Sequence, residues 1–294
     1  MYPARFDYEA PETLDAALAV FAERGEDARV LAGGQSLIPM MKLRFATPAA
    51  LVDVNRVPGL DHIDEADGQL RLGALVRHNA IVGSALVHDR NHVMAAAAPW
   101  IADPLVRNLG TIGGSLAHAD PEGDWASVML ACRGEVVATS TSGQRVIPMA
   151  ELISGPFTTS LQPGEMLTEV RVPIATRPNG GAYLKLERKV GDYATVAVAT
   201  RLELDPGTGH IADAGIALTS VAPSNLQATA AEQVLVGEAP GEELFAEAAE
   251  LAAQAARPRR DVRGSEEYKR HVVKVYVRRG LARCHELATA AAPS

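Results

Sequence analysis

Cysteine is scarce in this sequence. Its 294 residues include two cysteines, Cys132 and Cys284, which are too far apart to form a Cys-x-x-Cys motif. An iron–sulfur cluster usually needs about four thiolate ligands, so we expect this chain to carry none. The sequence leaves a disulfide between the two open, but two free thiols in a reducing cytoplasm are the expected state.

Long hydrophobic runs are also missing. No run approaches the roughly 20 apolar residues that cross a membrane, and Met1–Asp7 do not begin an apolar signal-peptide segment. The expected location is therefore the cytoplasm, with peripheral contact to a membrane left open.

Positive charge is in deficit, because 28 Lys and Arg residues stand against 36 Asp and Glu residues, for a net charge of −8. This balance argues against a general nucleic-acid-binding protein. It does not exclude an anionic ligand, because backbone N–H groups hold phosphate without Lys or Arg. The length of 294 residues suggests two or three domains of about 100–200 residues each.

Several enzyme motifs are absent. There is no Gly-x-Ser-x-Gly, His-Glu-x-x-His or paired-carboxylate motif, so no hydrolase and no catalytic residue is predicted. The fingerprint Gly-x-Gly-x-x-Gly and the P-loop are missing too, which disfavours a Rossmann site and an ATPase. His88 and His92 could share one helix face, but a zinc site needs about three protein ligands and no third is evident, so no metal is predicted.

The first pattern that the sequence does contain is a small α/β unit over 1–57. Residues 11–24 predict an amphipathic helix that ends at Gly25 and has one apolar face, formed by Leu14, Ala17, Leu18 and Phe21. Residues 28–31 and 51–54 predict short buried strands.

The rest of the chain mixes strands and helices. In 58–176 we expect strands at 69–75, 135–140 and 166–172 and helices at 77–87, 93–101 and 124–132. The lack of regular alternation indicates an α+β fold rather than a doubly wound sheet. The residues Arg177–Gly181 are typical of a turn and mark a boundary. In 177–294 we expect strands at 183–188, 195–204 and 214–221 and helices at 224–236, 241–255 and 265–288.

Two glycine loops carry the strongest chemical signal: Ala32-Gly33-Gly34-Gln35-Ser36 and Thr111-Ile112-Gly113-Gly114-Ser115. Glycine lets a ligand approach the backbone closely, and successive N–H groups in such turns form an anion-binding concavity. The hydroxyls of Ser36, Thr111 and Ser115 can donate to phosphate oxygens. Two such loops could clamp a pyrophosphate, although each Gly-Gly pair alone is also an ordinary tight turn.

The residues around these loops resemble a known family. Ala32–Ser36, continued by Leu37–Arg44, resembles the first flavin loop of the medium subunit of aerobic carbon monoxide dehydrogenase. Ile101–Ser115 resembles the second loop, and Lys189–Ala194 resembles the third signature of that family. The similarity extends over about 1–288 with all three motifs in family order. It is highly specific for the family and only weakly specific for the substrate.

The resemblance implies a fold, a cofactor and a set of site residues. The fold is a vanillyl-alcohol-oxidase-type FAD-binding fold in two subdomains, with a C-terminal domain of antiparallel strands and helices, and FAD is bound non-covalently. Ala32–Ser36 and Thr111–Ser115 would hold the pyrophosphate. Ile101 and Tyr193 would lie near the isoalloxazine ring, which an aromatic face can shield. Further implied contacts are Asp120 and Asp124 to ribityl or ribose hydroxyls, Lys185 as a cation near the ring, and Leu161.

Each of these residues also has a structural interpretation. Ile101 and Leu161 are typical core residues, and Tyr193 is typical of a packed surface aromatic. Asp124 could cap a helix, Asp120 could close an Asx-turn, and Lys185 could be a solvated edge charge. A solvated surface, or next a contact to a partner subunit, is expected for the basic residues Arg257, Arg259, Arg260 and Arg263.

The resemblance further implies an electron-transfer subunit. A large molybdenum-cofactor subunit would oxidise the substrate, and a small subunit with 2Fe-2S clusters would relay electrons to FAD. A quinone or other acceptor would then receive them, in a dimer of heterotrimers. Gln35 stands where the carbon monoxide enzymes usually have His, so relatives that oxidise N-heterocycles, aldehydes or aromatic thioesters are the alternative. A stand-alone flavin oxidase and a nucleotide-binding assembly module are the other classes left open.

Overall fold

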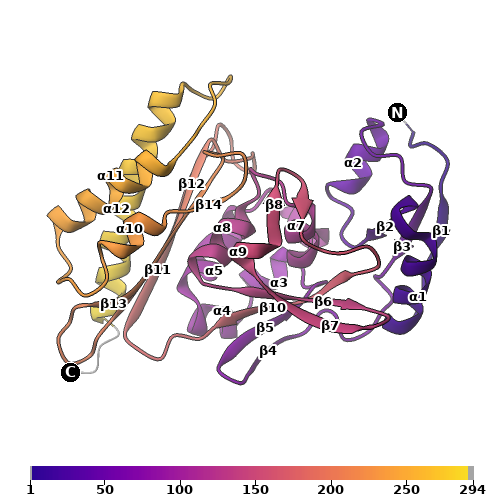
Figure 1. Ribbon diagram of the computed structural model, residues 1–294, viewed down its shortest axis with the longest axis horizontal. Coiled ribbons are helices and arrows are strands. Elements are labelled where there is room, and N and C mark those ends of the chain that lie inside the picture. Colours follow the sequence, from indigo (N-terminus) through magenta and orange to yellow (C-terminus); the bar gives the residue numbers. More distant parts are fainter. Residues whose placement is uncertain (1, 291–294) are drawn as a thin grey trace.

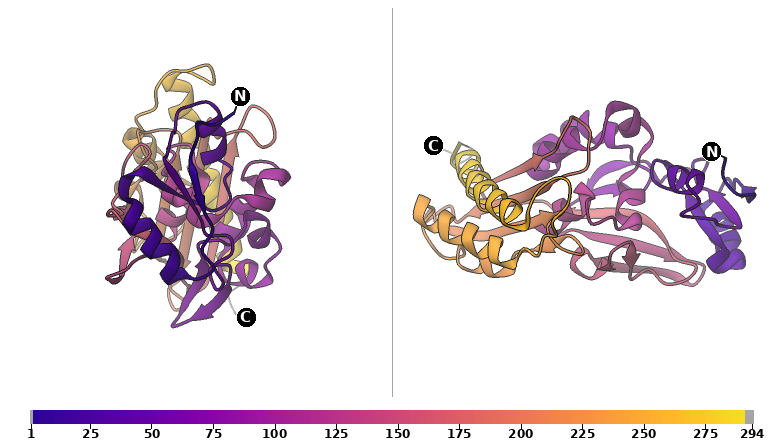
Figure 2. Two further views of the ribbon diagram at one scale, coloured as in Figure 1. Left: turned by 90° about the vertical axis from the view of Figure 1, so that its right-hand side faces the viewer. Right: turned by 90° about the horizontal axis from the view of Figure 1, so that it is seen from above.

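The computed structural model describes residues 2–290, so Met1 and the end of the expected C-terminal part, 291–294, lie outside it. The molecule is elongated, and its three main sheets follow one another along the long axis in sequence order (Figure 1). The N-terminal part lies at one end, and the C-terminal helices cover the other (Figure 2). Among residues 2–290, no helix is both long and apolar enough to cross a membrane.

The N-terminal part is built on a parallel three-stranded sheet of order β1-β3-β2, with β1 at Asp7–Glu9, β2 at Ala28–Leu31 and β3 at Ala50–Asp53. Helix α1 (Leu14–Arg24) buries Ala17 and Leu18 against it. The helix begins where the Thr13 hydroxyl accepts a hydrogen bond from the Ala16 N–H at 3.2 Å. The expected helix and strands are confirmed, while β1, the short η1 (Gly25–Asp27) and α2 (Leu37–Lys42) were not expected.

The middle part holds an antiparallel five-stranded sheet of order β4-β5-β10-β6-β7. Its strands are β4 (Ile63–Ala66), β5 (Gln69–Gly73), β6 (Glu135–Ser140), β7 (Gly143–Pro148) and β10 (Met166–Pro173). The three expected strands are confirmed, and the edge strands β4 and β7 were missed because they expose polar side chains. A short hairpin, β8 (Ile153–Gly155) and β9 (Thr158–Thr159), follows helix α9 (Met149–Leu152).

Short helices fill the space between this sheet and the next. They are α3 (His78–Val82), α4 (Ala85–Arg90), α5 (His92–Ala97), η2 (Ala98–Trp100), α6 (Pro104–Leu109), α7 (Ile112–His118) and α8 (Asp124–Ala131). The single helix expected at 77–87 is wrong, because Gly83 ends α3 and the Ser84 hydroxyl caps the start of α4 by accepting from the Val87 N–H. The helices expected at 93–101 and 124–132 are confirmed, the first with a 3-10 last turn.

The C-terminal part is an antiparallel sheet of order β11-β12-β13-β14 covered by helices. The strands are β11 (Asn179–Leu186), β12 (Val196–Leu204), β13 (Ile211–Thr219) and β14 (Leu226–Gln227). The helices are α10 (Thr229–Gln233), α11 (Glu242–Ala255) and α12 (Glu266–Ala290). The helix expected at 224–236 is shorter than predicted, because its first residues pair with β13 as β14.

Gly180 and Gly181 are not turn residues, so that interpretation is wrong. Both lie inside strand β11, paired with β12. A Cβ on Gly180 would come 2.0 Å from the Cys284 carbonyl oxygen of α12, and one on Gly181 would come 2.5 Å from Val93 of α5. Helices therefore approach this strand closely on both faces, which requires glycine. Side chains on the two faces of this sheet therefore belong to two different hydrophobic cores.

Candidate cofactor site

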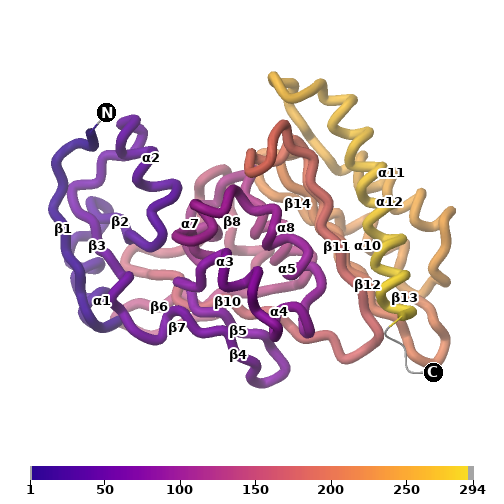
Figure 3. Tube along the Cα trace, turned by 180° about the vertical axis from the view of Figure 1, so that it is seen from behind, coloured from indigo at the N-terminus to yellow at the C-terminus, as the bar shows by residue number. Residues whose placement is uncertain are grey.

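The two glycine loops, one after strand β2 and the other at the start of helix α7, lie directly against each other. A Cβ on Gly33 would come 2.2 Å from the Leu109 carbonyl oxygen and 2.8 Å from Gly110 Cα. A Cβ on Gly114 would lie 3.9 Å from that of Ala32. The tube in Figure 3 shows the same approach of the N-terminal part to α7. The two loops are therefore neighbours in space, and their binding of a diphosphate stays a prediction.

The first loop follows strand β2 and leads into α2. Gly34 has a φ of 70°, a conformation that favours glycine. The Gln35 side chain folds back and donates from Nε2 to the Gly33 carbonyl at 2.9 Å, which stiffens the turn. Ser36 precedes α2, and its hydroxyl makes no capping bond to that helix. That hydroxyl is therefore free to donate to a ligand.

The second loop is the first turn of helix α7 rather than an open turn, so the turn interpretation is wrong here. Thr111 caps the helix, and its hydroxyl accepts from the Gly114 N–H at 3.1 Å. Ile112 is fully buried, and a Cβ on Gly113 would come 2.5 Å from that of Ala74. These two residues bring α7 close to the sheet. Gly114 is left exposed on the side that faces Ala32 of the first loop, and Ser115 beside it is half-buried.

Asp124 and Lys185 form a buried ion pair, although they lie on α8 and β11. Lys185 Nζ donates to Asp124 Oδ2 and to the Trp100 carbonyl, each at 3.0 Å, and the Tyr183 hydroxyl donates to Asp124 Oδ1. The Lys185 side chain is 1% exposed. Two structural interpretations are therefore wrong: Gly123, not Asp124, is the N-cap of α8, and Lys185 is not a solvated edge charge.

Burial governs the titration of this cluster. It raises the pKa of the Asp124 carboxyl, and the Lys185 ammonium and the Tyr183 hydroxyl offset part of that rise. Burial and the neighbouring Asp124 carboxylate together raise the pKa of the Tyr183 hydroxyl well above its ordinary value. Glu187 also approaches Lys185 Nζ, at 3.7 Å, and its Oε2 has no hydrogen-bond partner. The Lys185 ammonium therefore pairs with two carboxylates, those of Asp124 and Glu187.

The third motif, Lys189–Ala194, lies against the first residues of the second motif, Ile101–Ser115. A Cβ on Gly191 would come 3.2 Å from the Ala102 carbonyl, so 189–194 and 101–104 are neighbours. Tyr193 is 47% exposed, and burial of its hydroxyl beside Asp120 raises the pKa of Tyr193 to about 12. Asp120 closes an Asx-turn by accepting from the Glu122 N–H at 2.9 Å, which confirms that interpretation.

The aliphatic candidates are packed rather than free. Ile101 is 7% exposed and belongs to the main core, which confirms its structural interpretation. Its carbonyl accepts from Arg107 Nη1 at 3.0 Å, which anchors the turn where Ala102 has a φ of 48°. Leu161 follows β9, which packs against α7, and is partly buried on the same core.

The two histidines and the basic run have different surroundings. His88 lies on α4 and His92 on α5, so they do not share a helix face. Residues 2–290 contain no group of His, Cys, Asp and Glu that could hold a metal ion. Arg263 is not a solvated charge, because its Nη1 donates to Glu122 at 2.7 Å and to the Ala194 carbonyl at 3.4 Å. That expectation was wrong for Arg263, while the other three arginines of the run are exposed.

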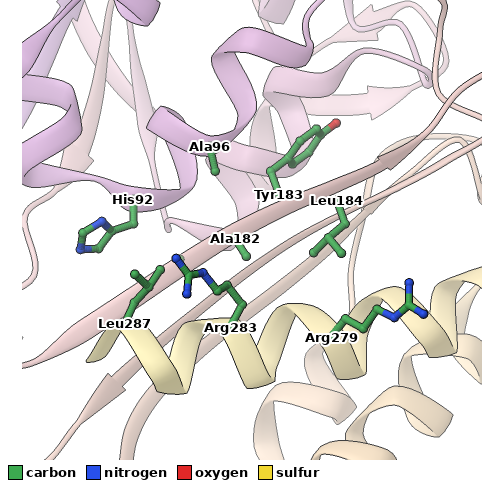
Figure 4. A pocket seen from close by; sticks show the side chains of 9 residues that line it. His92, Ala96, Ala182, Tyr183, Leu184, Arg279, Arg283 and Leu287 are labelled. Carbon is green, nitrogen blue, oxygen red and sulfur yellow. The ribbon is translucent and has the colours of Figure 1, made fainter. Parts of the chain in front are cut away.

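A cavity of about 310 Å³ lies elsewhere, between α5, β11 and α12. Figure 4 shows His92 on one wall and Arg279 and Arg283 on the other, with Ala182 on the strand between them. Its lining includes no residue of either glycine loop. It therefore does not include the glycine loops, although Tyr183, which donates to Asp124, is one of its lining residues.

Sequence reasoning missed two residues at the junction of the loops, Asn55 and Arg77. Asn55 Nδ2 donates to the Ala32 carbonyl at 2.8 Å, and Arg77 Nη1 donates to the Leu109 carbonyl. Neither residue belongs to a glycine motif, and nothing in their spacing indicates the contact.

Two family models match nearly the whole chain. Residues 4–175 match the FAD binding domain in molybdopterin dehydrogenase, and residues 181–284 match the CO dehydrogenase flavoprotein C-terminal domain. The chain therefore belongs to the family of FAD-binding subunits of the molybdopterin dehydrogenases, which are oxidoreductases. FAD is its cofactor, and the expected α+β fold, a two-subdomain FAD-binding part followed by a C-terminal domain, is confirmed.

Within this family the chain is similar to medium chains of carbon monoxide dehydrogenase. It is 40% identical to that of Hydrogenophaga pseudoflava, over 97% of this chain and 100% of the relative. It is 38% identical to the 6-hydroxypseudooxynicotine dehydrogenase complex subunit alpha of Paenarthrobacter nicotinovorans, over 96% and 95%. The structure of the Hydrogenophaga enzyme that lacks the Mo-pyranopterin moiety matches with a TM-score of 0.93 and 41% identity, over 97% and 100%.

Proposed function

We propose that Ala32–Ser36 and Thr111–Ser115 together hold the diphosphate of a non-covalently bound FAD. The observation that carries this proposal is the contact of Gly33 with Leu109 and Gly110, where any side chain at Gly33 would force the loops apart. The positive-φ turn at Gly34 and the uncapped hydroxyl of Ser36 supply donors at this junction. Gly114 faces it from α7, and because the N–H groups of Gly114 and Ser115 are already bonded to Thr111, the donor that the second loop would add is the Ser115 hydroxyl. These residues fit a diphosphate without a lysine.

The ring end of the cofactor is proposed to lie at the neighbouring motifs. Ile101, Leu161 and Tyr193 would contact the flavin, and Asp120 would contact the ribityl or ribose hydroxyls. Both oxygens of Asp124 are occupied by Tyr183 and Lys185, so Asp124 would act through Lys185 by fixing its ammonium near the ring. Bound FAD supplies one- and two-electron transfer, and these side chains bind, orient and shield it.

The proposed role is an electron-transfer subunit of a molybdenum hydroxylase. It would take electrons from the 2Fe-2S clusters of a small subunit, beside a large molybdenum-cofactor subunit, and pass them to a quinone or other acceptor. Carbon monoxide is the leading substrate of the holoenzyme, supported by the identity to carbon monoxide dehydrogenase medium chains. Dehydrogenases of N-heterocycles, aldehydes or aromatic thioesters are the second candidate, supported by the nicotine-related relatives.

Finer points of organisation are part of the same proposal. The chain would divide into 1–57, 58–176 and 177–294, supported by one main sheet within each range. It would act in the cytoplasm, where thiols stay reduced, supported by the unpaired and buried state of Cys132 and Cys284. A dimer of heterotrimers and peripheral contact with a membrane complete the proposed assembly.

Purification of the full chain tests the proposal. We expect a yellow protein that absorbs at about 450 nm, as flavins do. Acid precipitation should release unmodified FAD from it. A folded chain that stays colourless in excess FAD contradicts the proposed site. Co-expression with the partner subunits should then give carbon monoxide-dependent reduction of a quinone analogue, and no reduction by the isolated chain. Substrate turnover by the isolated chain would instead favour a stand-alone flavin oxidase.

A further inference from the structure

Arg77 joins the backbone of one glycine loop to a side chain beside the other. Its Nη1 donates to the Leu109 carbonyl, immediately before the second loop, and its Nη2 donates to Asn55 Oδ1 at 2.6 Å. The Leu109 carbonyl is the same group that lies against Gly33. The guanidinium therefore sits at the point where the two loops meet.

Asn55 completes the connection to the first loop. Its Nδ2 donates to the Ala32 carbonyl at 2.8 Å while its Oδ1 accepts from Arg77. Asp53 Oδ1 accepts from both the backbone N–H and the Nδ2 of Asn55, at 2.9 Å and 2.6 Å. The Tyr8 hydroxyl donates to the other Asp53 oxygen at 2.6 Å. The amide of Asn55 is thus held in one orientation, with one end toward each loop.

The backbone on both sides of Arg77 is tied to the second loop. The Val76 carbonyl accepts from the Ile112 N–H, and the His78 N–H donates to the Gly110 carbonyl, each at 3.0 Å. Arg77 therefore moves with α7, whereas Asn55 moves with the N-terminal sheet. The bond from Arg77 Nη2 to Asn55 Oδ1 is therefore a cross-link between the parts that carry the two loops.

We propose that Asn55 and Arg77 are positioning residues that set the spacing of the two glycine loops for a diphosphate. This inference rests on the proposed function, because it presumes that the loops hold the FAD diphosphate. An arginine suits the place because its planar fork reaches two acceptors at once, whereas lysine offers a single charged point. Arg77 is charged and half-buried, so the loss of its bonds should weaken the equilibrium by about 10-fold, while the exposed Asn55 bond to Ala32 contributes less.

A double-mutant cycle tests this assignment. The apoprotein forms of wild type, Asn55→Ala, Arg77→Ala and the double variant are titrated with FAD by quenching of flavin fluorescence. We expect each single variant to bind FAD about 10-fold more weakly. The double variant should lose much less than the product of the two factors, because the residues act as one link. Arg90→Ala, which removes an exposed pair with Glu65, is the matched control and should bind normally.

Two further probes separate positioning from general damage. ADP, which carries only the diphosphate half, should lose affinity by the same factor as FAD. Riboflavin, which has no phosphate, should compete for the ring end with unchanged affinity. Asn55→Asp keeps an acceptor for Arg77, loses the Nδ2 bonds to Ala32 and to Asp53, and places a second carboxylate beside Asp53, so it should weaken the binding of FAD and ADP alike. Apoprotein melting temperatures are recorded for every variant.

The outcomes are distinct. If wild type binds no FAD, the proposed function itself fails. If wild type binds FAD and the folded variants bind FAD and ADP equally well, the positioning role is overturned. Equal losses for riboflavin, FAD and ADP, together with lowered melting temperatures, would also overturn it, because the pair would then stabilise the fold only. Additive losses in the double variant would refute the link between the two residues.

Discussion

The indole Nε1 of Trp125 donates to Nδ1 of His78 at 3.0 Å inside the main core. His78 therefore keeps Nδ1 unprotonated, and burial, together with Arg107 and Arg77 nearby, lowers its pKa to about 4. The His78 N–H binds the Gly110 carbonyl. A Cβ on Gly110 would come 2.8 Å from His78 Nε2, so the neutral imidazole packs against the backbone just before the second glycine loop.

Mild acid should destabilise the protein through His78. Its pKa is lower in the folded than in the unfolded state, so its contribution is complete above about pH 6.5 and is lost as the pH falls toward 4. The loss should reach about 3 kcal/mol. Urea unfolding at a series of pH values measures it. His78→Gln cannot titrate and should show a flatter profile; an unchanged slope would contradict the assignment.

Gly33→Ala should separate the two loops. The new Cβ would meet the Leu109 carbonyl oxygen at 2.2 Å, so the backbone must shift. We expect FAD affinity to fall at least about tenfold, equal to about 1.4 kcal/mol, with flavin loss measured by equilibrium dialysis. Gly241→Ala is the control, since nothing lies within 4 Å of its added Cβ and its φ of −168° suits any residue.

Removing one partner of the buried Asp124–Lys185 pair should lower the free energy of unfolding more per residue than removing both partners. Lys185→Met leaves the Asp124 carboxylate buried without its ammonium, and Asp124→Asn leaves Lys185 with Glu187 alone. We expect each to lower the free energy of unfolding of the apoprotein by about 3–5 kcal/mol, and the double variant by much less than their sum. Chemical denaturation gives these values. Additive effects would show that the two groups do not stabilise each other.

Both cysteines should be unreactive toward thiol reagents in the folded state. Cys132 and Cys284 are buried and unpaired, and burial raises the pKa of Cys284 to about 12. Since the thiolate is the reactive form, Ellman's reagent at pH 8 should label neither residue until the chain is unfolded, and then both. Rapid labelling of one thiol in the native protein would place it at the surface.

Local pattern predicted much of this fold. The helix of 11–24 follows from its apolar spacing and from Gly25, which ends it. The strands at 28–31, 135–140 and 195–204 follow from their apolar composition, because a strand buried on one or both faces shows it in its own residues. The resemblance of the glycine motifs predicted the family and FAD. These features depend on residues that are neighbours in the chain.

Contacts between residues that are far apart in the sequence could not be predicted from the sequence pattern. The pairing of Asp124 with Lys185 spans 61 positions, and that of Asn55 with Arg77 spans 22. Gly180 and Gly181 have turn composition, yet they lie in a strand because two helices press on it. Gly113 is similar, since it brings α7 onto Ala74. In each case the neighbour that constrains the residue is absent from its local sequence.

The amino-acid sequence by itself thus determined which segments form helices and strands and where glycine and hydroxyl groups for a nucleotide are placed. Only the tertiary structure decided that Gly33 meets Leu109, and that Asn55 and Arg77 span the junction. The physical reason is the distance along the chain over which each effect acts. Backbone propensity and apolar periodicity act over a few residues, whereas a site built from two sheets exists only after their cores have packed.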